Sequence, residues 1–192
     1  EIPLPTVRHA LRAARAQGVR TLLNVAPAVP LDDADLACVD WLVVNEGEAA
    51  LLSGLAVNDA ASAGAAALAL QARGAAQVLV TLGSAGVLHL VTHGKALYDA
   101  LKNLLDNPAP GQSLGELITH PDQLAPKVQA VDTTGAGDTF VGAFAAGLVA
   151  GDAQALPRAL GAAALQVTRH GTQSAMPTRA ELDAFLATLA TA

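Results

Sequence analysis

The chain has 192 residues, of which 52% are hydrophobic and 15% charged, and its formal net charge is −6. This composition can bury a substantial core, and no run approaches the roughly 18 uninterrupted apolar residues of a membrane-spanning helix. Nucleic acids and anionic membranes attract clustered Lys and Arg, which the sequence lacks, so we expect neither as a partner. The composition favours a globular protein with a small-molecule partner.

The single cysteine, Cys38, lies in the apolar stretch "LACVDWLVV". One cysteine excludes an internal disulfide and a cysteine-based zinc cluster, and it suits a reducing compartment. We therefore expect a buried structural thiol and a cytoplasmic location.

Helical and strand patterns alternate along the first half of the chain. Helices are predicted at 5–17, 46–54 and 58–74, and strands at 20–26, 39–45, 76–83 and 85–91, the last pair joined through a Gly83–Gly86 turn. Short apolar strands that alternate with helices are typical of a largely parallel sheet covered on both faces. The expected fold class is α/β, as a three-layer α/β/α arrangement.

The second half is predicted to contain one strand and then only helices. The strand is "PKVQAV" at 126–131, and the helices are at 138–150, 153–169 and 178–190. The last begins with "TRAE", a capping box in which Thr178 and Glu181 satisfy each other's end of the helix. The intervening segment 93–125 breaks the α/β rhythm and is interpreted as an atypical insertion, either an elaborated loop or a flap over a site.

The stretch "AVDTTGAGDTF" places Gly135, Ala136 and Gly137 directly before Asp138 and a helix of small apolar residues. Bare backbone N–H groups at a helix N-terminus form a positive concavity suited to phosphate oxygens. A carboxylate beside it repels a phosphate in the ground state but can accept a proton from a hydroxyl during phosphoryl transfer. The alternative is that Asp138 only caps the helix and that the glycines only make a tight turn.

The longer motif "VDTTGAGDTFVGAF" resembles the C-terminal signature of the ribokinase-like (PfkB type) carbohydrate kinases. Three further stretches resemble that family: "VVNEGEA", "VTLGSAGV" and "VTRHGTQSAMP". The resemblance is nearest to the family's ribokinase members, as "LNVAPA" also suggests, and it covers the chain outside 93–125. It implies one partial kinase domain over 1–192 that phosphorylates a sugar hydroxyl with ATP.

The resemblance also implies a role for each matching residue. Asp138 is the general base, and Gly135, Ala136 and Gly137 form the anion hole. The residues expected near the nucleotide phosphates are Asn45, Glu48, Thr81, Gly83 and Gly86, with Glu48 holding Mg²⁺ through water. A monovalent cation such as K⁺ is expected at Asp132, Thr134 and Gly171.

Plainer interpretations remain open for these residues. Asn45 and Glu48 can be a helix cap with a solvated acid. Thr81 and Gly83 can form a simple turn, and Asp132 can accept a local Asx-type hydrogen bond. The sequence has no Walker motif, and its glycine loop follows the last predicted strand, whereas a dinucleotide-binding protein has GxGxxG after the first. A different phosphate binder and a non-catalytic interaction module are therefore the alternative functions.

The sequence departs from the family in two respects. No stretch resembles the Gly-Gly-x-x-x-Asn sugar motif and the lid strands that precede these motifs in the family. The N-terminal half and the lid are therefore expected to be absent. Because most residues that recognise the sugar would lie in that half, the sugar is undetermined. Leu160 and Gly161 stand where the family often has an Asn near the adenine.

We predict that residues 1–192 alone self-associate, bind ATP weakly and phosphorylate no sugar at a measurable rate. A parallel sheet built from these strands leaves an open edge that recruits other chains, and without a positioned hydroxyl the favourable positioning contribution of about 7–11 kcal/mol is lost. Size-exclusion chromatography, ATP titration and a coupled ADP-release assay over a sugar panel test this. Robust sugar-dependent ADP release from a monomer would contradict it.

Overall fold

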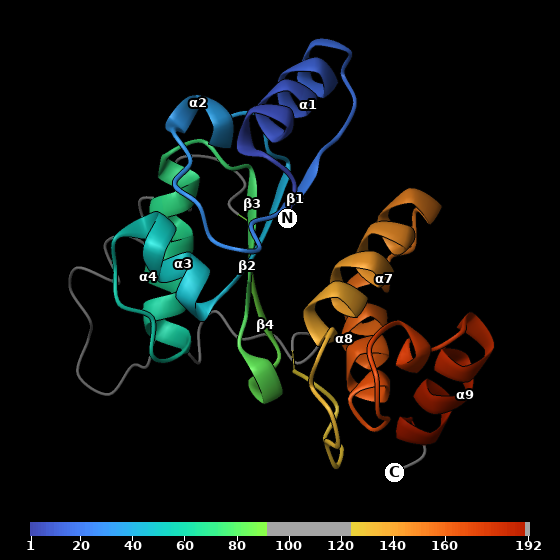
Figure 1. Cartoon of the computed structure of the whole chain (residues 1–192). Helices are drawn as coiled ribbons and strands as arrows, with labels where there is room; N and C mark the ends of the chain where they lie inside the picture. Colours follow the sequence, from blue (N-terminus) through green and yellow to red (C-terminus); the bar gives the residue numbers. More distant parts are fainter. Residues whose placement is uncertain (92–123, 191–192) are drawn as a thin grey trace. The chain divides into compact units, whose positions relative to one another are not determined.

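The computed structural model describes residues 1–91 and 124–190, which fall into two compact units (Figure 1). Unit 1 holds the described residues of Glu1–Leu82 and Leu88–Thr119, and unit 2 those of Gly83–Val87 and His120–Ala192. Within these described ranges, no helix is both long and apolar enough to cross a membrane.

The first unit is built on a four-stranded sheet with strand order β1-β2-β3-β4, in which β1 pairs with β2 and β2 with β3 in parallel. Its strands are β1 (Leu22–Asn24), β2 (Trp41–Asn45), β3 (Gln77–Thr81) and β4 (Val87–Val91). Its helices are α1 (Leu4–Ala16), α2 (Asp33–Leu36), α3 (Glu46–Ser53) and α4 (Ala60–Ala72). The predicted order of elements and the β3–β4 pairing are confirmed, although β1 is shorter than predicted.

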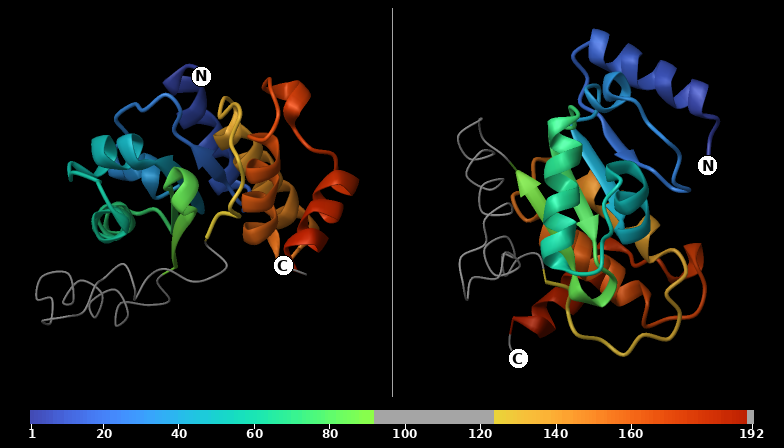
Figure 2. Two further views of the ribbon diagram at one scale, coloured as in Figure 1. Left: turned by 90° about the horizontal axis from the view of Figure 1, so that it is seen from below. Right: turned by 90° about the vertical axis from the view of Figure 1, so that its left-hand side faces the viewer.

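The two central strands are buried on both faces, as their unbroken apolar sequences require. Leu42 and Val44 on β2, and Val78 and Val80 on β3, have no exposed surface. Helix α3 packs on β2, and α4 packs on β3 (Figures 1 and 2). The inward face of α4 is largely alanine, with Ala63, Ala66 and Ala67 fully buried, so the helix can approach its neighbours closely.

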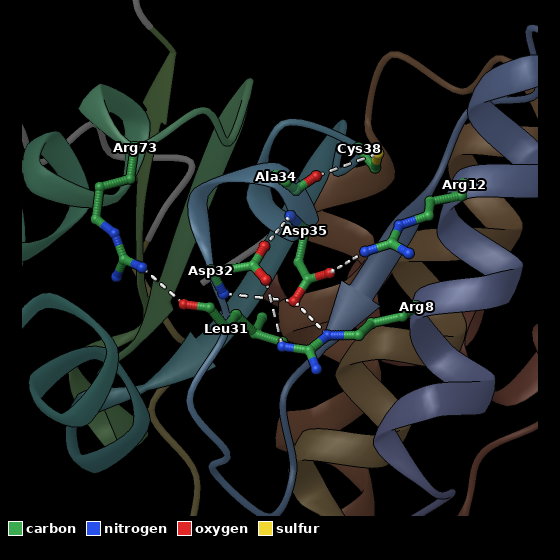
Figure 3. A network of polar contacts seen from close by, with 8 residues as sticks. All are labelled: Arg8, Arg12, Leu31, Asp32, Ala34, Asp35, Cys38 and Arg73. Carbon is green, nitrogen blue, oxygen red and sulfur yellow. Dashed lines mark hydrogen bonds and ion pairs between the residues drawn. The ribbon is translucent and has the colours of Figure 1, made fainter.

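Helix α1 is tied to α2 by ion pairs with a buried carboxylate (Figure 3). Asp35 is only 1% exposed, and its Oδ2 accepts a hydrogen bond from Nε of Arg8 at 2.7 Å, while Nη2 of Arg12 lies 3.7 Å from its Oδ1. Asp35 also closes a capping box with Asp32 at the start of α2. Because α2 spans only four residues, it offers no helical periodicity, and the sequence analysis missed it.

Arg73 connects the end of α4 to two other segments of unit 1. Its Nη1 donates to the carbonyl oxygen of Leu52 at 2.6 Å, and its Nη2 donates to that of Leu31 at 2.7 Å. Its Nε also pairs with Asp33 at 2.7 Å. The planar guanidinium therefore holds α3, α4 and the loop before α2 together, a geometry that a lysine cannot reproduce.

Unit 2 contains three α-helices among its described residues: α7 (Ala136–Ala150), α8 (Ala155–Gln166) and α9 (Arg179–Leu189). The short 3₁₀ helix η3 (Gln173–Ala175) precedes α9. Helix α7 packs closely on α8 because Gly147 has no side chain: a Cβ there would lie 2.6 Å from Cβ of Ala155. The predicted capping box is present, since Thr178 N–H donates to Glu181 Oε2 at 2.7 Å.

The structure differs from the predictions at 126–131 and at Cys38. The strand predicted at 126–131 is wrong, because that segment is irregular and the N–H groups of Val131 and Asp132 instead donate to the carbonyl oxygen of Val167 at 2.7 and 3.1 Å. The cysteine is half-buried rather than buried. Of the insertion predicted at 93–125, residues 93–123 lie outside the described residues.

We predict that Arg73→Met lowers the free energy of unfolding by about 2–4 kcal/mol, because two backbone carbonyl groups lose charged donors. Chemical denaturation of the chain, followed by circular dichroism, measures this. The matched control is Arg15→Met, at an exposed arginine that forms no ion pair with a described residue. Equal effects of the two substitutions would contradict the prediction.

Candidate functional site

The predicted site residues of unit 1 meet at the carboxyl end of two neighbouring strands. Asn45 ends β2, Thr81 ends β3, and the two residues are register partners in the parallel pair. Open parallel sheets bind ligands outside this edge of their strands. Sequence motifs 36 positions apart are therefore adjacent in the fold, as the parallel sheet predicted from the sequence requires.

Asn45 and Glu48 form a reciprocal cap at the start of α3. Asn45 N–H donates to Glu48 Oε2 at 2.8 Å, and Glu48 N–H donates to Asn45 Oδ1 at 2.9 Å. The Glu48 residue is only 8% exposed, so its carboxyl group is held close to the strand end. The helix cap considered in the sequence analysis is present, but the acid is not a freely solvated one.

The Gly83–Gly86 turn joins β3 to β4 through the short 3₁₀ helix η1 (Gly83–Ala85). Gly83 and Gly86 have φ angles of 54° and 105°, in the region that side chains disfavour, and Gly86 N–H donates to the carbonyl oxygen of Gly83 at 3.1 Å. Thr81 Oγ1 donates to the carbonyl oxygen of Val44 at 3.4 Å. Both glycines are thus required by the turn itself.

In unit 2, the glycine loop leads directly into α7. Gly135 is the N-cap residue with a φ of 80° and offers no capping side chain, and Asp138 lies exposed in the first turn. Ala136 N–H donates to the carbonyl oxygen of Thr133 at 3.2 Å. In the part of the chain that the structure describes, no residue accepts a hydrogen bond from the N–H groups of Gly135, Gly137 or Asp138.

Asp132 organises the loop before Gly135. Its Oδ1 accepts a hydrogen bond from Thr134 N–H at 3.0 Å, and its Oδ2 accepts one from Gly171 N–H at 3.1 Å. These amides, that of Thr134 first, lower the pKa of Asp132 to about 2, so the carboxylate is ionised at neutral pH. The predicted cation residues are therefore joined to one another, and the Asx-type bond considered in the sequence analysis is part of the same arrangement.

Gln166, the last residue of α8, is a site residue that was not predicted from the sequence. Its side chain is fully buried, and Nε2 donates to the carbonyl oxygen of Thr134 at 2.7 Å. A glutamine in "AAALQVTR" has no distinctive pattern, and only the packing of α8 against the loop shows its contact. The one feature of the sequence that is compatible with this contact is a polar residue on an otherwise apolar helix.

Two cavities flank the first turn of α7 within unit 2. One has a volume of about 460 Å³ and includes Asp138 and Thr139 among its lining residues. The other, of about 340 Å³, is mainly apolar and extends from Gly83 and Ser84 to Thr133 and Ala136. Leu160 lines this second cavity, whereas Gly161 faces α9, where a Cβ would lie 2.6 Å from Leu186 Cδ2.

The described residues hold no group of three or more His, Cys, Asp or Glu side chains placed to bind a metal ion. An ion at either predicted position would therefore rely on one carboxylate, Glu48 or Asp132, together with backbone, hydroxyl or water oxygens.

The sequence profile of the "pfkB family carbohydrate kinase" family matches residues 1–106 and 115–179. The chain belongs to the pfkB family of carbohydrate kinases. Its relatives include ribokinases, and the predicted family and α/β fold are both confirmed.

The chain is 36% identical to a ribokinase of Haemophilus influenzae over 188 residues, which cover 97% of the chain and 53% of that ribokinase. It is 33% identical to a deoxyribokinase of Salmonella typhi, with 97% and 54% covered. The structure of the Arabidopsis thaliana ribokinase complexed with ribose and ATP superposes with a TM-score of 0.77 at 30% identity, covering 96% and 53%. The chain thus spans about half the length of the curated relatives it matches.

Proposed function

We propose that these residues form the catalytic and nucleotide-binding portion of an ATP-dependent kinase that phosphorylates a sugar hydroxyl. The observation that carries this proposal is the start of α7. There, the N–H groups of Gly137 and Asp138, which have no acceptor among the described residues, adjoin the exposed carboxylate of Asp138, and the glycine N-cap offers no capping side chain. A family of carbohydrate kinases supplies the reaction class.

In this mechanism, the hydroxyl oxygen of the sugar attacks the γ-phosphorus of ATP, and the Asp138 carboxylate accepts the proton of that hydroxyl group. The bond between that phosphorus and the β–γ bridging oxygen breaks, and ADP leaves with the electron pair. The loop amides of Gly135 and Gly137, with that of Asp138, stabilise the charge that spreads over the equatorial oxygens of the transferring group. The N–H of Ala136, which was also expected in the anion hole, is bonded to the carbonyl oxygen of Thr133 instead. An exposed carboxylate is accessible to a substrate, as a general base must be.

The apolar cavity of about 340 Å³ is the proposed seat of the nucleoside part of ATP. Its walls at Leu160, Ala163 and Ala164 suit the flat face of a purine, and it reaches Thr133 and Ala136 beside the phosphate-binding amides. ATP in the relative from Arabidopsis thaliana supports this ligand class. Leu160 lines this proposed seat, so apolar contact would there replace the asparagine that the family often has near the adenine.

Glu48, with Asn45 and Thr81 beside it, is the proposed location of Mg²⁺. A carboxylate fits this hard cation, and one hydrogen bond to Asn45 N–H leaves Glu48 with lone pairs for a water ligand of the ion. When bound, Mg²⁺ neutralises charge on the phosphate oxygens. The buried cap keeps the carboxylate fixed at the strand end.

Asp132, Thr134 and Gly171 are the proposed location of a monovalent cation such as K⁺. The carboxylate carries a full charge at neutral pH, and its two oxygens are already oriented by the amides of Thr134 and Gly171. A bound cation would balance that charge beside the glycine loop.

The proposed substrate is a pentose, with ribose favoured over other sugars. A ribokinase is 36% identical to the chain and a deoxyribokinase 33% identical. The matched residues alone therefore do not determine whether the substrate is ribose or deoxyribose. Kinases of the same family that act on fructose, sugar acids or nucleosides are the alternative.

Asp138→Asn is predicted to lower kcat by roughly 10² to 10⁴, the range for a lost general base, with little change in ATP affinity. Turnover is measured in a completed enzyme, in which the chain is joined to the part of the Haemophilus influenzae ribokinase that it does not match. Asp183→Asn, at an exposed acid of α9, is the control and should leave turnover unchanged. Near-normal turnover of the Asp138 variant would rule out its role as base.

Replacing a large organic cation by potassium at constant ionic strength is predicted to raise the turnover of the completed enzyme. The reason is that an ion at Asp132 would order the loop that carries the phosphate-binding amides. Asp132→Asn should remove the dependence of turnover on potassium, because the asparagine side chain carries no negative charge. Identical rates of the unsubstituted enzyme in both salts would eliminate the cation site.

A further inference from the structure

Gln166 makes one hydrogen bond from a fully buried position. Its Nε2 donates to the carbonyl oxygen of Thr134 at 2.7 Å, whereas its Oε1 has no hydrogen-bond partner in the described structure. A flipped amide would set two oxygens against each other, so the donor must face Thr134. An unpaired buried acceptor is unfavourable, and an apolar side chain of the same length would fill this space without it. Burial alone therefore does not explain a glutamine here.

The hydrogen bond fixes the plane of the peptide that joins Thr134 to Gly135. That peptide is trans, because the only cis bond among the described residues is Ala26–Pro27. In a trans peptide, the C=O and N–H groups point in opposite directions. With its oxygen held toward α8 by Gln166, this peptide directs the N–H of Gly135 away from α8.

Gly135 allows the amide of Gln166 to approach this closely. A Cβ at Gly135 would lie 3.2 Å from Gln166 Nε2 and 3.6 Å from Cβ of Thr172. Gly135 is also in the left-handed region, with a φ of 80°. The glycine is thus required by backbone conformation and by contact with Gln166, and its N–H has no acceptor among the described residues.

We propose that Gln166 is a positioning residue for the phosphate-binding loop. By holding the carbonyl oxygen of Thr134, it directs the N–H of Gly135 to the same side as the N–H groups of Gly137 and Asp138. All three N–H groups can then bind one phosphoryl group. Gln166 is fully buried, so it acts through the loop and not on a ligand directly. This inference rests on the proposed kinase function and adds a residue that orients the loop from behind.

Gln166→Met tests the role because methionine is unbranched and of similar length but cannot donate a hydrogen bond. A purely structural role for Gln166 predicts a loss of thermal stability. A positioning role predicts that the melting temperature stays close to that of the unsubstituted enzyme. The substitution removes the unpaired acceptor, and the carbonyl group that loses its donor belongs to Thr134, an exposed residue that can bond to water instead. Leu182→Met, a volume-conserving change at a buried position on α9, is the matched control.

The first measurement is an NMR titration of the completed enzyme with inorganic phosphate. In the unsubstituted enzyme and in the Leu182→Met control, the amide signals of Gly135, Gly137 and Asp138 should shift together. In Gln166→Met, the Gly135 signal should no longer respond and the apparent phosphate Kd should rise about tenfold, as for a lost or misdirected anion-hole donor. Unchanged phosphate binding by Gln166→Met, or absence of phosphate binding by the unsubstituted completed enzyme, would overturn the proposal.

The second measurement is turnover of the completed enzyme. Gln166→Met should lower kcat by about 10- to 100-fold while the KM for the sugar stays the same, because a misdirected donor acts mainly on the transition state. If Asp138→Asn abolishes turnover but Gln166→Met leaves both kcat and phosphate binding unchanged, the positioning role is wrong and the kinase function stands. If Asp138→Asn is also without effect, the role of Asp138 as base fails as well. If the unsubstituted completed enzyme phosphorylates no sugar, the proposed function itself fails.

Discussion

The left-handed backbone of Gly135 is the constraint on which the candidate site in unit 2 depends. A φ of 80° turns the chain so that α7 begins at the next residue. Ala136 N–H is bonded to Thr133, and the N–H groups of Gly137 and Asp138 have no acceptor in the part of the chain that the structure describes. A side chain at this position would be strained and would meet Gln166. The position of Asp138, in the first turn beside those amides, follows from where the helix begins.

In unit 1, the parallel pairing of β2 with β3 determines where the candidate site residues lie. Because the side chains of a strand alternate and parallel strands run in the same direction, the in-register pair of Asn45 and Thr81 must lie at one edge of the sheet. The buried run Leu42–Val44 holds this register, since a one-residue slip would bring different side chains against α3 and α4. The core of the sheet thus determines where the polar strand ends lie.

Local signals in the sequence predicted most of the fold correctly. Glycine stops and capping residues identified the helices, and the box of Thr178 and Glu181 forms with the predicted partners. The errors have physical causes. "PKVQAV" has the composition of a strand, but the backbone of Val131 and Asp132 bonds to the end of α8, a contact that no local pattern encodes. Helix α2 is too short to show a period.

The candidate site was predictable to the extent that its residues are consecutive or belong to a known motif. The glycine loop and the Asn45–Glu48 pair are of this kind. Gln166 is not, because it lies 32 positions from Thr134 and reaches the loop only through the packing of α7 on α8. Contacts made by the back of a loop depend on the tertiary fold, and a single sequence carries little trace of them.

Hydrogen bonding within the loops and binding of a ligand are compatible at these positions. Glu48 caps α3 and Asp132 closes an Asx turn, which are the plain structural roles that their spacing predicts. Yet each carboxylate has about four lone-pair sites, and the amides that it accepts occupy only part of them. The bonds to the backbone restrict the rotation of each carboxylate, and at Asp132 they also favour the charged form, as its lowered pKa shows. A carboxylate that is already oriented loses less freedom when a cation or its water binds, so the capping bonds prepare these side chains for the proposed roles rather than compete with them.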